Sequence, residues 1–388
     1  MIYDNLSVKN PQVKAACCAS VKLGKHSSIP LSTKPWGRDI EAVRGKSFLT
    51  TIFEMTRISY DDFEIGESIG MGTVGVIYRV TRKTTGDVYA LKLLHPSLGQ
   101  DPLVVRRFRR EMMVLSKLNH PNIVAYFGDG DRDGQLFFVM ELIQGSTLKE
   151  MLQKSGEFSW LEAAECGRQI AAALQHAHNH GIIHRDLKPG NVFVNQEGVI
   201  KLGDFGIARD LRDHDLTETG LTVGTYAYMA PELIKGERGI TGQVDLYALG
   251  CVLFEMMTGR TPYLGDNFAV IFEQHLNSDP PHVREFVPNC PVALDELICQ
   301  LLAKSPEDRP FNARTVQGIL GELCLGPTSR MIAERGDRAA SDVHPIQLSL
   351  IERIGMSTPS QELSWRAITI LGLSLAAVMA AIIVFAKL

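Results

Sequence analysis

One stretch of this chain specifies more residues by identity than any other. It reads His184-Arg185-Asp186-Leu187-Lys188-Pro189-Gly190-Asn191, and thirteen residues after Asn191 comes Asp204-Phe205-Gly206. Five identities in the first segment and three in the second arise together by chance with a probability of about 10⁻¹⁰, at about 5% per residue type. The two segments therefore mark where the chemistry of this chain resides.

A glycine pattern lies upstream, at Gly70, Gly72 and Gly75. Dinucleotide-binding folds use the same spacing, but there the third glycine opens a helix and an acidic residue follows about twenty positions later. Here the residues after Gly75 are β-branched and alternating, which predicts a strand, and the next strand carries Lys92. Glycines let backbone amides approach phosphate oxygens because no Cβ interferes. The pattern predicts a phosphate-binding turn between two strands, with a lysine on the third.

With Ala230-Pro231-Glu232, these motifs make residues 63–325 resemble the eukaryotic-like serine/threonine protein kinase family, especially its bacterial membrane-bound members. The resemblance implies an α+β, bilobal fold with a β-rich N-lobe and an α-rich C-lobe. It also implies ATP-dependent phosphorylation of serine and threonine hydroxyls on protein substrates, with Mg²⁺, or Mn²⁺ in its place, as the metal. Two rivals stay open: a pseudokinase scaffold, and a small-molecule kinase, which the segment 224–232 disfavours.

The resemblance assigns roles to individual residues. Asp186 would accept the proton of the substrate hydroxyl, Lys188 would add positive charge at the γ-phosphate, and Lys92 would hold the α/β-phosphates with Glu111 as its acidic partner. Asn191 and Asp204 would hold metal ions, since hard cations prefer oxygen ligands. The implied ATP-binding residues are Ile69, Gly70, Met71, Gly72, Thr73, Val74, Gly75, Val76, Ile77 and Lys92, with Glu141 and Ile143 in the hinge.

Other matches to the family are architectural. Glu232 and Arg309 resemble its buried ion pair, and Asp245 resembles the helix-borne aspartate that braces the catalytic loop. Met140 matches the position of the residue that, in the family, closes the back of the adenine pocket. Ile77 departs from the pattern, because valine is more usual at that position.

The segment 204–232 is implied to be an activation loop. Arg185 precedes the catalytic aspartate, and in kinases with that pair a phosphorylated loop residue neutralises the arginine and orders the loop. Thr217 and Thr219 have the spacing of autophosphorylation sites in bacterial relatives, so we expect phosphorylation there. Thr225 matches the threonine that lines the substrate pocket of serine/threonine kinases.

Composition divides the chain into four zones: a leader (1–62), the kinase domain (63–325), a linker (326–364) and a membrane anchor (365–387). Residues 1–60 carry nine Lys and Arg against four Asp and Glu, and their prolines predict a mostly disordered leader, with Met55 as an alternative start. A basic leader on an acidic body is not the charge pattern of a nucleic-acid binder.

Residues 367–386 form a run of 20 residues without charge. At ~1.5 Å per residue the run spans about 30 Å, the thickness of the hydrocarbon core of a bilayer. Trp365 and Arg366 stand at its near edge and Lys387 at its far edge, where amphipathic and snorkelling side chains lie. The alternative, a buried core helix, fits less well because core helices seldom stay apolar on every side over such a length.

This anchor predicts a location and a mode of association. ATP and Mg²⁺ are cytosolic, so the kinase domain is expected in the cytoplasm on a single-pass membrane protein, with a bacterial inner membrane as its location. Gly372, Ala376 and Ala380 form a stripe of small residues that predicts homodimer packing through the anchor.

Two motifs that mimic metal sites are set aside. Asp129-x-Asp131-x-Asp133-Gly134 resembles the start of an EF-hand loop, but strands are expected on both sides, so we predict a solvated hairpin turn. His176, His178, His180 and His184 lack surrounding carboxylates and predict no metal. The seven cysteines include no CxxC pair, so neither a zinc site nor a redox motif is predicted from them.

Patterning also predicts the order of elements. We expect strands over 63–69, 74–81, 88–94, 123–127 and 135–141, and helices over 102–118, 159–180, 241–257 and 292–303. Asp101 is expected to cap the first helix, and Ser159 with Glu162 to form a capping box at the second.

Overall fold

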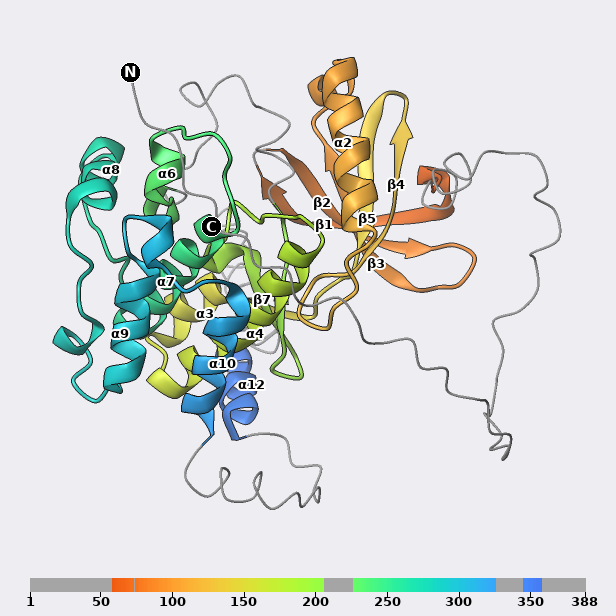
Figure 1. The fold of residues 1–388 in the computed structure, drawn as a ribbon. Coiled ribbons are helices and arrows are strands. Elements are labelled where there is room, and N and C mark those ends of the chain that lie inside the picture. The colour runs from red at the N-terminus through yellow and green to blue at the C-terminus, as the bar shows by residue number, and fades with distance from the viewer. Residues whose placement is uncertain (1–57, 73, 206–225, 326–344, 358–388) are drawn as a thin grey trace, which may run out of the picture. The chain divides into compact units, whose positions relative to one another are not determined.

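The computed structural model describes residues 58–72, 74–205, 226–325 and 345–357 (Figure 1). Within these residues the chain forms a β-rich N-lobe followed by a helical C-lobe, which is the bilobal α+β fold expected from the motifs. Residues 58–62, which the sequence assigned to the leader, belong to the fold, since Ser59 caps a short 3₁₀ helix η1 (Tyr60–Asp62) and Ile58 N–H donates to the Asp129 carbonyl.

The N-lobe contains one antiparallel sheet and one long helix. Its five strands run in the order β1-β2-β3-β5-β4. They are β1 (Phe63–Gly72), β2 (Gly75–Arg82), β3 (Val88–Leu94), β4 (Tyr126–Arg132) and β5 (Gln135–Met140), and the helical segments are η2 (Pro96–Gly99) and α2 (Pro102–Leu115).

Alternation along β5 explains why helix α2 covers one face of this sheet. Successive strand side chains point to opposite faces. Phe138 packs with Phe108 and Met112 of α2, whereas Phe137 packs in a second cluster on the other face, which includes Leu91 of β3. The two neighbouring phenylalanines of β5 are thereby both buried, one on each face of the sheet.

Helix α2 begins as its sequence predicts. Asp101 is the N-cap and accepts a hydrogen bond from Leu103 N–H at 2.8 Å, and Pro102 occupies the first turn, where its missing N–H costs nothing. The helix ends at Leu115 rather than near residue 118, because Ser116 terminates it and 3₁₀ turns follow.

The predicted strand over 123–127 lies later in the chain, as β4. It runs through Asp129 and Asp131 to a turn at Asp133 and Gly134, whose φ angles of 52° and 82° suit an aspartate–glycine hairpin turn. Strands therefore flank this motif, as expected. Asp129 is not solvated, however: it is buried and accepts a hydrogen bond from the Tyr126 hydroxyl.

The C-lobe is built on two buried helices, α4 and α7 (Figure 1). Its helices are α3 (Leu148–Ser155), α4 (Trp160–Asn179), α6 (Pro231–Ile234), α7 (Gln243–Thr258), α8 (Phe268–Asn277), α9 (Val292–Leu301), α10 (Ala313–Cys324) and α12 (Pro345–Ser357). A small sheet has the order β6 (Gly145–Thr147), β7 (Val192–Asn195) and β8 (Ile200–Leu202). Short 3₁₀ helices are η3 (Pro189–Asn191), η4 (Tyr226–Tyr228), η5 (Val283–Glu285) and η6 (Pro306–Asp308).

The predicted capping box at the start of α4 is present. Ser159 Oγ accepts from Glu162 N–H at 3.3 Å, and the Glu162 carboxylate accepts from Ser159 N–H at 2.8 Å. The same Glu162 carboxylate binds Arg353, whose Nε lies 2.9 Å from Oε1. Glu162 thus links the start of α4 to a residue of the distant α12.

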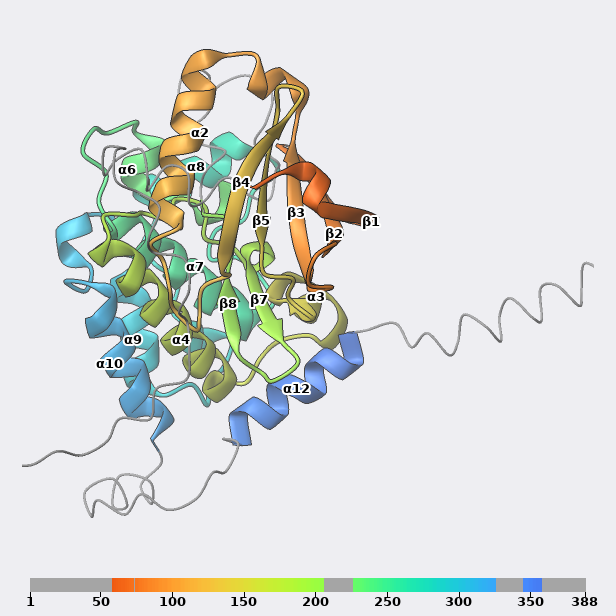
Figure 2. The same cartoon turned by 90° about the vertical axis from the view of Figure 1, so that its right-hand side faces the viewer.

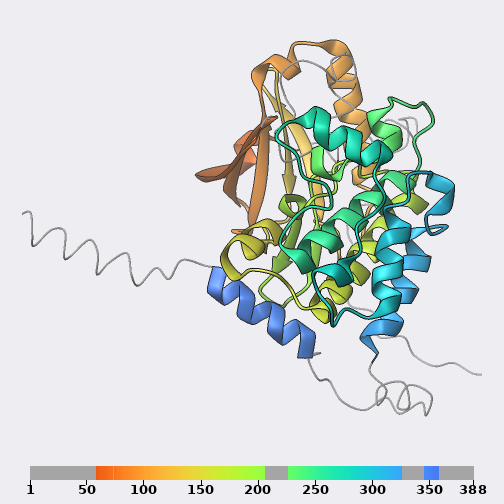
Figure 3. The same cartoon turned by 90° about the vertical axis from the view of Figure 1, so that its left-hand side faces the viewer.

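Helix α12 contradicts the prediction of a linker over 326–364, because its residues 345–357 pack against the C-lobe (Figures 2 and 3). Ile346, Leu350 and Ile354 recur every four residues and are 4%, 0% and 6% exposed. Arg353 also stacks over the ring of Phe158 at 4.5 Å. The mixed composition of this segment led to the prediction of a linker. The helix is indicated only when its few apolar residues are compared with the 3.6-residue period of an α-helix.

Across the described ranges no helix has the length and apolarity needed to cross a bilayer. The predicted membrane segment 367–386 lies outside those ranges, as does the leader up to residue 57.

Candidate active site

The glycine turn joins β1 to β2, and the two strands stay paired up to the turn, where Gly72 lies opposite Gly75. Packing requires glycine at position 75, because a Cβ there would stand 2.1 Å from the Leu93 carbonyl oxygen of β3. Gly70 and Gly72 meet no such obstacle, since the nearest atoms would lie at ordinary contact distances of 3.6 and 3.9 Å. At Gly70 and Gly72 the lack of a side chain is therefore not needed for packing against neighbouring residues. It leaves the backbone amides open to a ligand.

Lys92 lies opposite Ile77 on the sheet and forms an ion pair with Asp204, with 2.6 Å between Nζ and Oδ1. The pairing expected with Glu111 of α2 is not formed between these two described side chains. Glu111 is half-buried on α2. Asp204 follows β8 in the C-lobe. The ion pair joins the two lobes.

The predicted base, Asp186, accepts hydrogen bonds from its neighbours at only one of its two carboxylate oxygens. Lys188 Nζ lies 2.8 Å from Asp186 Oδ2, and Asn191 Nδ2 donates to the same oxygen at 3.1 Å and to the Asp186 carbonyl at 2.8 Å. Among the described residues Asp186 Oδ1 has no hydrogen-bond partner. The loop therefore presents one carboxylate oxygen that can accept a proton from a substrate hydroxyl.

Asp245, near the start of α7, fixes the backbone of this loop. Its Oδ2 accepts from His184 N–H and its Oδ1 from Arg185 N–H, both at 2.8 Å, and the Asp245 side chain is 1% exposed. Arg185 adopts φ = 61°, a left-handed conformation that non-glycine residues seldom take. Such a conformation persists only where the surroundings hold it, and the two backbone hydrogen bonds that the Asp245 carboxylate accepts do so.

The second carboxylate, Asp204, is positioned by the buried ring of His184. His184 Nε2 lies 2.9 Å from the Gly203 carbonyl oxygen, and the imidazole packs against Phe205 with 4.7 Å between ring centroids. Burial opposes ionisation of Asp204, but Lys92 in contact, with His184 and Lys188 nearby, holds the pKa of its carboxyl below the ordinary value. Asp204 is therefore ionised at neutral pH.

The donor set of Asp204 and Asn191 fits a hard divalent cation such as Mg²⁺. Asn191 commits its amide nitrogen to Asp186, which leaves the amide oxygen for a cation. Asp204 contributes an ionised carboxylate. Mg²⁺ prefers oxygen ligands of this kind and is usually bound by one or two protein groups together with substrate phosphates.

The predicted hinge follows β5 directly. Glu141 N–H donates to the Ala125 carbonyl at 2.8 Å, and its carboxylate pairs with Lys201 at 2.8 Å. Within the described part of the chain, neither the Glu141 carbonyl nor Ile143 N–H has a hydrogen-bond partner. The hinge thus offers one acceptor and one donor to a planar heterocycle.

Met140 lines a small cavity behind this hinge, with a volume of about 30 Å³. The cavity holds at most a water molecule or two. It is lined by Leu115, Leu118, Ile123, Val124, Tyr126, Phe138, Met140, Gly203, Asp204 and Phe205. Met140, at the end of β5, therefore lines the same cavity as Asp204, and its role at the back of the adenine pocket stays a prediction.

A model of the protein kinase domain matches residues 63–318 of this chain. The chain belongs to the protein kinase family. Its kinase domain is similar to a probable serine/threonine-protein kinase of Corynebacterium efficiens, 35% identical over 308 residues, which are 76% of this chain and 46% of that protein. It is also similar to the serine/threonine-protein kinase PknB of Mycolicibacterium smegmatis, 37% identical over 267 residues, or 67% of this chain and 42% of the relative.

Among solved structures, the kinase domain of Mycobacterium tuberculosis PknI matches with a TM-score of 0.55 and 27% identity, covering 68% of this chain and 97% of that one. The chain spans less than half the length of the curated relatives it matches, at 46% and 42% for the two named above.

The architectural ion pair of the kinase domain is present and fully enclosed. Arg309 donates from Nη1 and Nη2 to the two carboxylate oxygens of Glu232, at 2.6 and 2.8 Å, and the Arg309 side chain is 0% exposed. The guanidinium also stacks over the ring of Tyr247 at 4.9 Å. This pair ties α6 to the segment between η6 and α10.

Four residues predicted for the kinase site lie outside the described residues: Thr73 in the glycine turn, and Thr217, Thr219 and Thr225 in the predicted activation loop.

Sequence reasoning missed two residues that support the kinase site. His178, set aside with the other histidines, places Nε2 2.8 Å from Asp245 Oδ2, beneath the catalytic loop. Lys201 holds the Glu141 carboxylate at the hinge. The only sign in the sequence that His178 has a structural role is that it lies on the same face of α4 as other buried residues. Nothing in the sequence links Lys201 to Glu141, which is 60 positions away.

Proposed function

We propose that this chain transfers the γ-phosphoryl group of ATP to serine and threonine hydroxyls of proteins, with Asp186 as the catalytic carboxylate. The observation that carries the proposal is the arrangement of Asp186, Lys188 and Asn191, in which one carboxylate oxygen is fixed and the other is left to a substrate. The similarity to bacterial serine/threonine-protein kinases supports the choice of acceptor.

In this mechanism the chain mainly positions groups and balances charge. Asp186 Oδ1 accepts the proton of the hydroxyl, and Lys188 stabilises the carboxylate and the charge near it. The Glu141 carbonyl and Ile143 N–H bind the adenine edge, while the backbone at Gly70 and Gly72 binds the phosphates. When bound to Asn191 and Asp204, Mg²⁺ neutralises charge on the transferred group.

An Asp186→Asn variant tests this function. It removes the carboxylate that accepts the proton but keeps the shape of the side chain, so phosphorylation of a model protein from radiolabelled ATP should fall at least ~10²-fold. Asp266→Asn changes an exposed aspartate and should keep activity. Near-wild-type turnover by a folded Asp186→Asn protein would contradict the assignment of the base.

A wild-type protein that binds ATP without transferring phosphate would instead be a pseudokinase scaffold. Transfer to small molecules but to no protein would point to a small-molecule kinase. The same assay, run with both classes of acceptor, separates these outcomes.

We also propose autophosphorylation of the activation loop at Thr217 and Thr219. The support is their spacing in the sequence and the presence of Arg185 next to the catalytic aspartate. A Thr217→Ala/Thr219→Ala variant should lose activity while its ATP affinity stays near the wild-type value, and Thr222→Ala is the matched control. Active enzyme that carries no phosphate on either threonine, by mass spectrometry, would rule this out.

Finally, we propose that residues 367–386 anchor the chain in a bacterial inner membrane, with the kinase domain in the cytoplasm, where it serves membrane-associated signalling. The support is the uncharged run of 20 residues and its flanking Trp365, Arg366 and Lys387. The full-length protein should sediment with membranes and a 1–364 truncation should not. Equal sedimentation of the two would contradict the anchor.

Homodimer formation through Gly372, Ala376 and Ala380 is part of the same proposal. Close contact in the membrane would raise the local concentration of kinase domains and favour phosphorylation between chains. Gly372→Leu/Ala376→Leu should reduce crosslinking and the rate of autophosphorylation, whereas Val378→Leu, off the stripe, should change neither. If the double variant behaves as wild type, the anchor is only a tether.

A further inference from the structure

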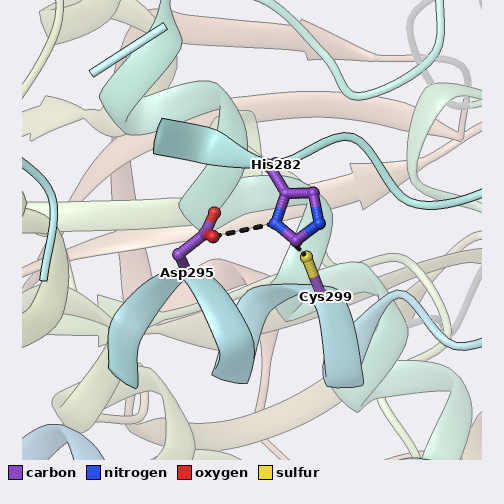
Figure 4. Close-up of side chains that lie close together, drawn as sticks. All are labelled: His282, Asp295 and Cys299. Carbon is purple, nitrogen blue, oxygen red and sulfur yellow. Dashed lines mark hydrogen bonds and ion pairs between the residues drawn. The ribbon is translucent and has the colours of Figure 1, made fainter. Parts of the chain in front are cut away.

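Three side chains of metal-binding type meet on the C-lobe, away from the kinase site (Figure 4). His282 precedes η5, whereas Asp295 and Cys299 both belong to α9. His282 Nδ1 lies 2.8 Å from Asp295 Oδ2 and 3.5 Å from Cys299 Sγ, and the three atoms all lie within 4.8 Å of one another. Residues four apart on a helix share a face, so α9 presents its two side chains to one point.

The contacts are not those of a nucleophilic triad. In such a triad the carboxylate and the nucleophile contact opposite nitrogens of the imidazole, so that a proton can pass through the ring. Here the carboxylate and the thiol both face Nδ1 of His282. A shared nitrogen cannot relay a proton between them.

Acidic residues surround the thiol. Asp295 is one of the three converging side chains, and Glu285 of η5 and Glu296 of α9 are also near Cys299. Negative charge around a convergent N, O and S set suits a cation.

We propose that His282, Asp295 and Cys299 bind one divalent transition-metal ion of the zinc type. Bonds of about 2.0 Å to nitrogen and oxygen and about 2.3 Å to sulfur, at tetrahedral angles, place the ligand atoms about 3.3 to 3.5 Å apart. The separation of Nδ1 and Sγ is already 3.5 Å, and that of Nδ1 and Oδ2 has to open from 2.8 Å. The third separation, between Asp295 Oδ2 and Cys299 Sγ, is no more than 4.8 Å, so side-chain rotation has to adjust it together with the first.

The surroundings hold two of the ligands in place and leave one side open. The Asp295 side chain is 7% exposed, and its second oxygen accepts from Arg284 N–H at 3.3 Å. Val283, next to the histidine, is fully buried and fixes the loop. The His282 side chain is 56% exposed, so an ion and a fourth ligand, water, can enter from solvent. Three protein ligands and one water form an open zinc site.

Ligand chemistry separates this site from the one at Asn191 and Asp204. Thiolate and imidazole favour zinc and similar ions, whereas Mg²⁺ prefers oxygen ligands and water. Bound metal would join the His282 loop to α9 and so stabilise the C-lobe, because a ligand that binds only the folded state raises the melting temperature.

The test uses the full chain, stripped of metal with a chelator and then loaded with Zn²⁺ in excess Mg²⁺. The wild type should retain one more equivalent of Zn²⁺ than Cys299→Ser or His282→Ala, and Zn²⁺ should raise its melting temperature by about 5 °C more than theirs. Cys324→Ser alters another partly buried cysteine and should behave as wild type. His282→Ala truncates a mostly exposed side chain and so keeps the comparison valid if Cys299→Ser folds poorly.

Co²⁺ in place of Zn²⁺ gives a second readout. A thiolate-to-cobalt charge-transfer band should appear in the wild type and in Cys324→Ser, and should be absent from Cys299→Ser and His282→Ala. Equal Zn²⁺ retention by the wild type and the two site variants, or a cobalt spectrum that Cys299→Ser leaves unchanged, would overturn the proposal.

Discussion

The Lys92 ammonium lies 2.6 Å from the Asp204 carboxylate, which joins β3 of the N-lobe to the segment that follows β8 in the C-lobe. One contact thus connects a residue proposed to hold phosphates with a residue proposed to hold metal. The Lys92 side chain is 14% exposed and the Asp204 side chain is 35% exposed, so solvent screens this ion pair less than it screens an ion pair on the surface.

Replacement of Lys92 should therefore affect catalysis more than folding. We expect Lys92→Met to lower kcat/KM for protein phosphorylation at least ~10²-fold, because it removes positive charge that positions the phosphates and leaves Asp204 without its partner. Steady-state kinetics over a range of ATP concentrations measures the effect. Lys235→Met, which changes an exposed lysine, is the control, and an equal loss there would point to a general effect of lost charge.

The buried pair of Glu232 and Arg309 predicts a large loss of stability. Arg309→Ala leaves the Glu232 carboxylate buried without a counter-charge, so the free energy of unfolding should fall by about 3–5 kcal/mol. Urea denaturation measures it. The exposed pair of Lys235 and Glu237, 3.7 Å apart, gives the comparison: Glu237→Ala should change stability by less than about 1 kcal/mol. Similar losses in the two variants would contradict a special role for burial.

His275 predicts sensitivity to acid. It is 0% exposed, with Nδ1 2.7 Å from the Tyr247 hydroxyl, and burial followed by the charge of Lys304 lowers its pKa to about 3. Between this pKa and the ordinary value of 6.5 the unfolded chain binds the proton and the folded chain does not. Folding stability should thus fall as the pH drops from about 6.5 towards 3, by up to about 1.4 kcal/mol per pH unit from this group.

The variant His275→Gln isolates that contribution. Its unfolding free energy should depend less steeply on pH below about 6 than that of the wild type, because no imidazole remains to titrate in the unfolded chain. His95→Gln, at an exposed histidine, should keep the wild-type slope. Parallel pH curves for wild type and His275→Gln would show that His275 is protonated in the folded state.

Truncation of two leucines on α12 should have different effects on the docking of this helix. Leu350 is 0% exposed and Leu348 is 51% exposed on the same helix. Truncation of a fully buried leucine costs about 2–5 kcal/mol, so Leu350→Ala should release α12 and abolish amide-exchange protection over 345–357. Leu348→Ala should retain that protection. Loss of protection in both variants would mean that α12 is held by its charged contacts alone.

Local patterns predicted much of the fold. The Asp101 cap, the Ser159 capping box and the strand after Gly75 depend on residues near one another in sequence, and the structure has all three. The motif residues Asp186 and Asn191 meet for the same reason, since five positions separate them.

The side-chain contacts that the sequence did not predict join segments that are far apart in the chain. Lys92 meets Asp204 across 112 positions, so the choice between Asp204 and Glu111 is made by the approach of the two lobes. His178 acquires its role from Asp245, 67 positions away. The meeting of His282 with Cys299 crosses a turn and follows no cysteine spacing that a motif search would detect.

The docking of α12 shortens the stretch of chain that connects the kinase domain to the proposed membrane anchor at 367–386. If the C-lobe were free from residue 325 onward, an extended chain up to residue 367 would let it range about 150 Å from a membrane anchor, at ~3.6 Å per residue. With α12 bound, only the ten steps from Ser357 to Ala367 remain, a working radius of about 35 Å. Anchored in this way, the active site would meet proteins at the membrane surface and leave those in the bulk cytoplasm out of reach, so that geometry rather than sequence recognition would select its substrates.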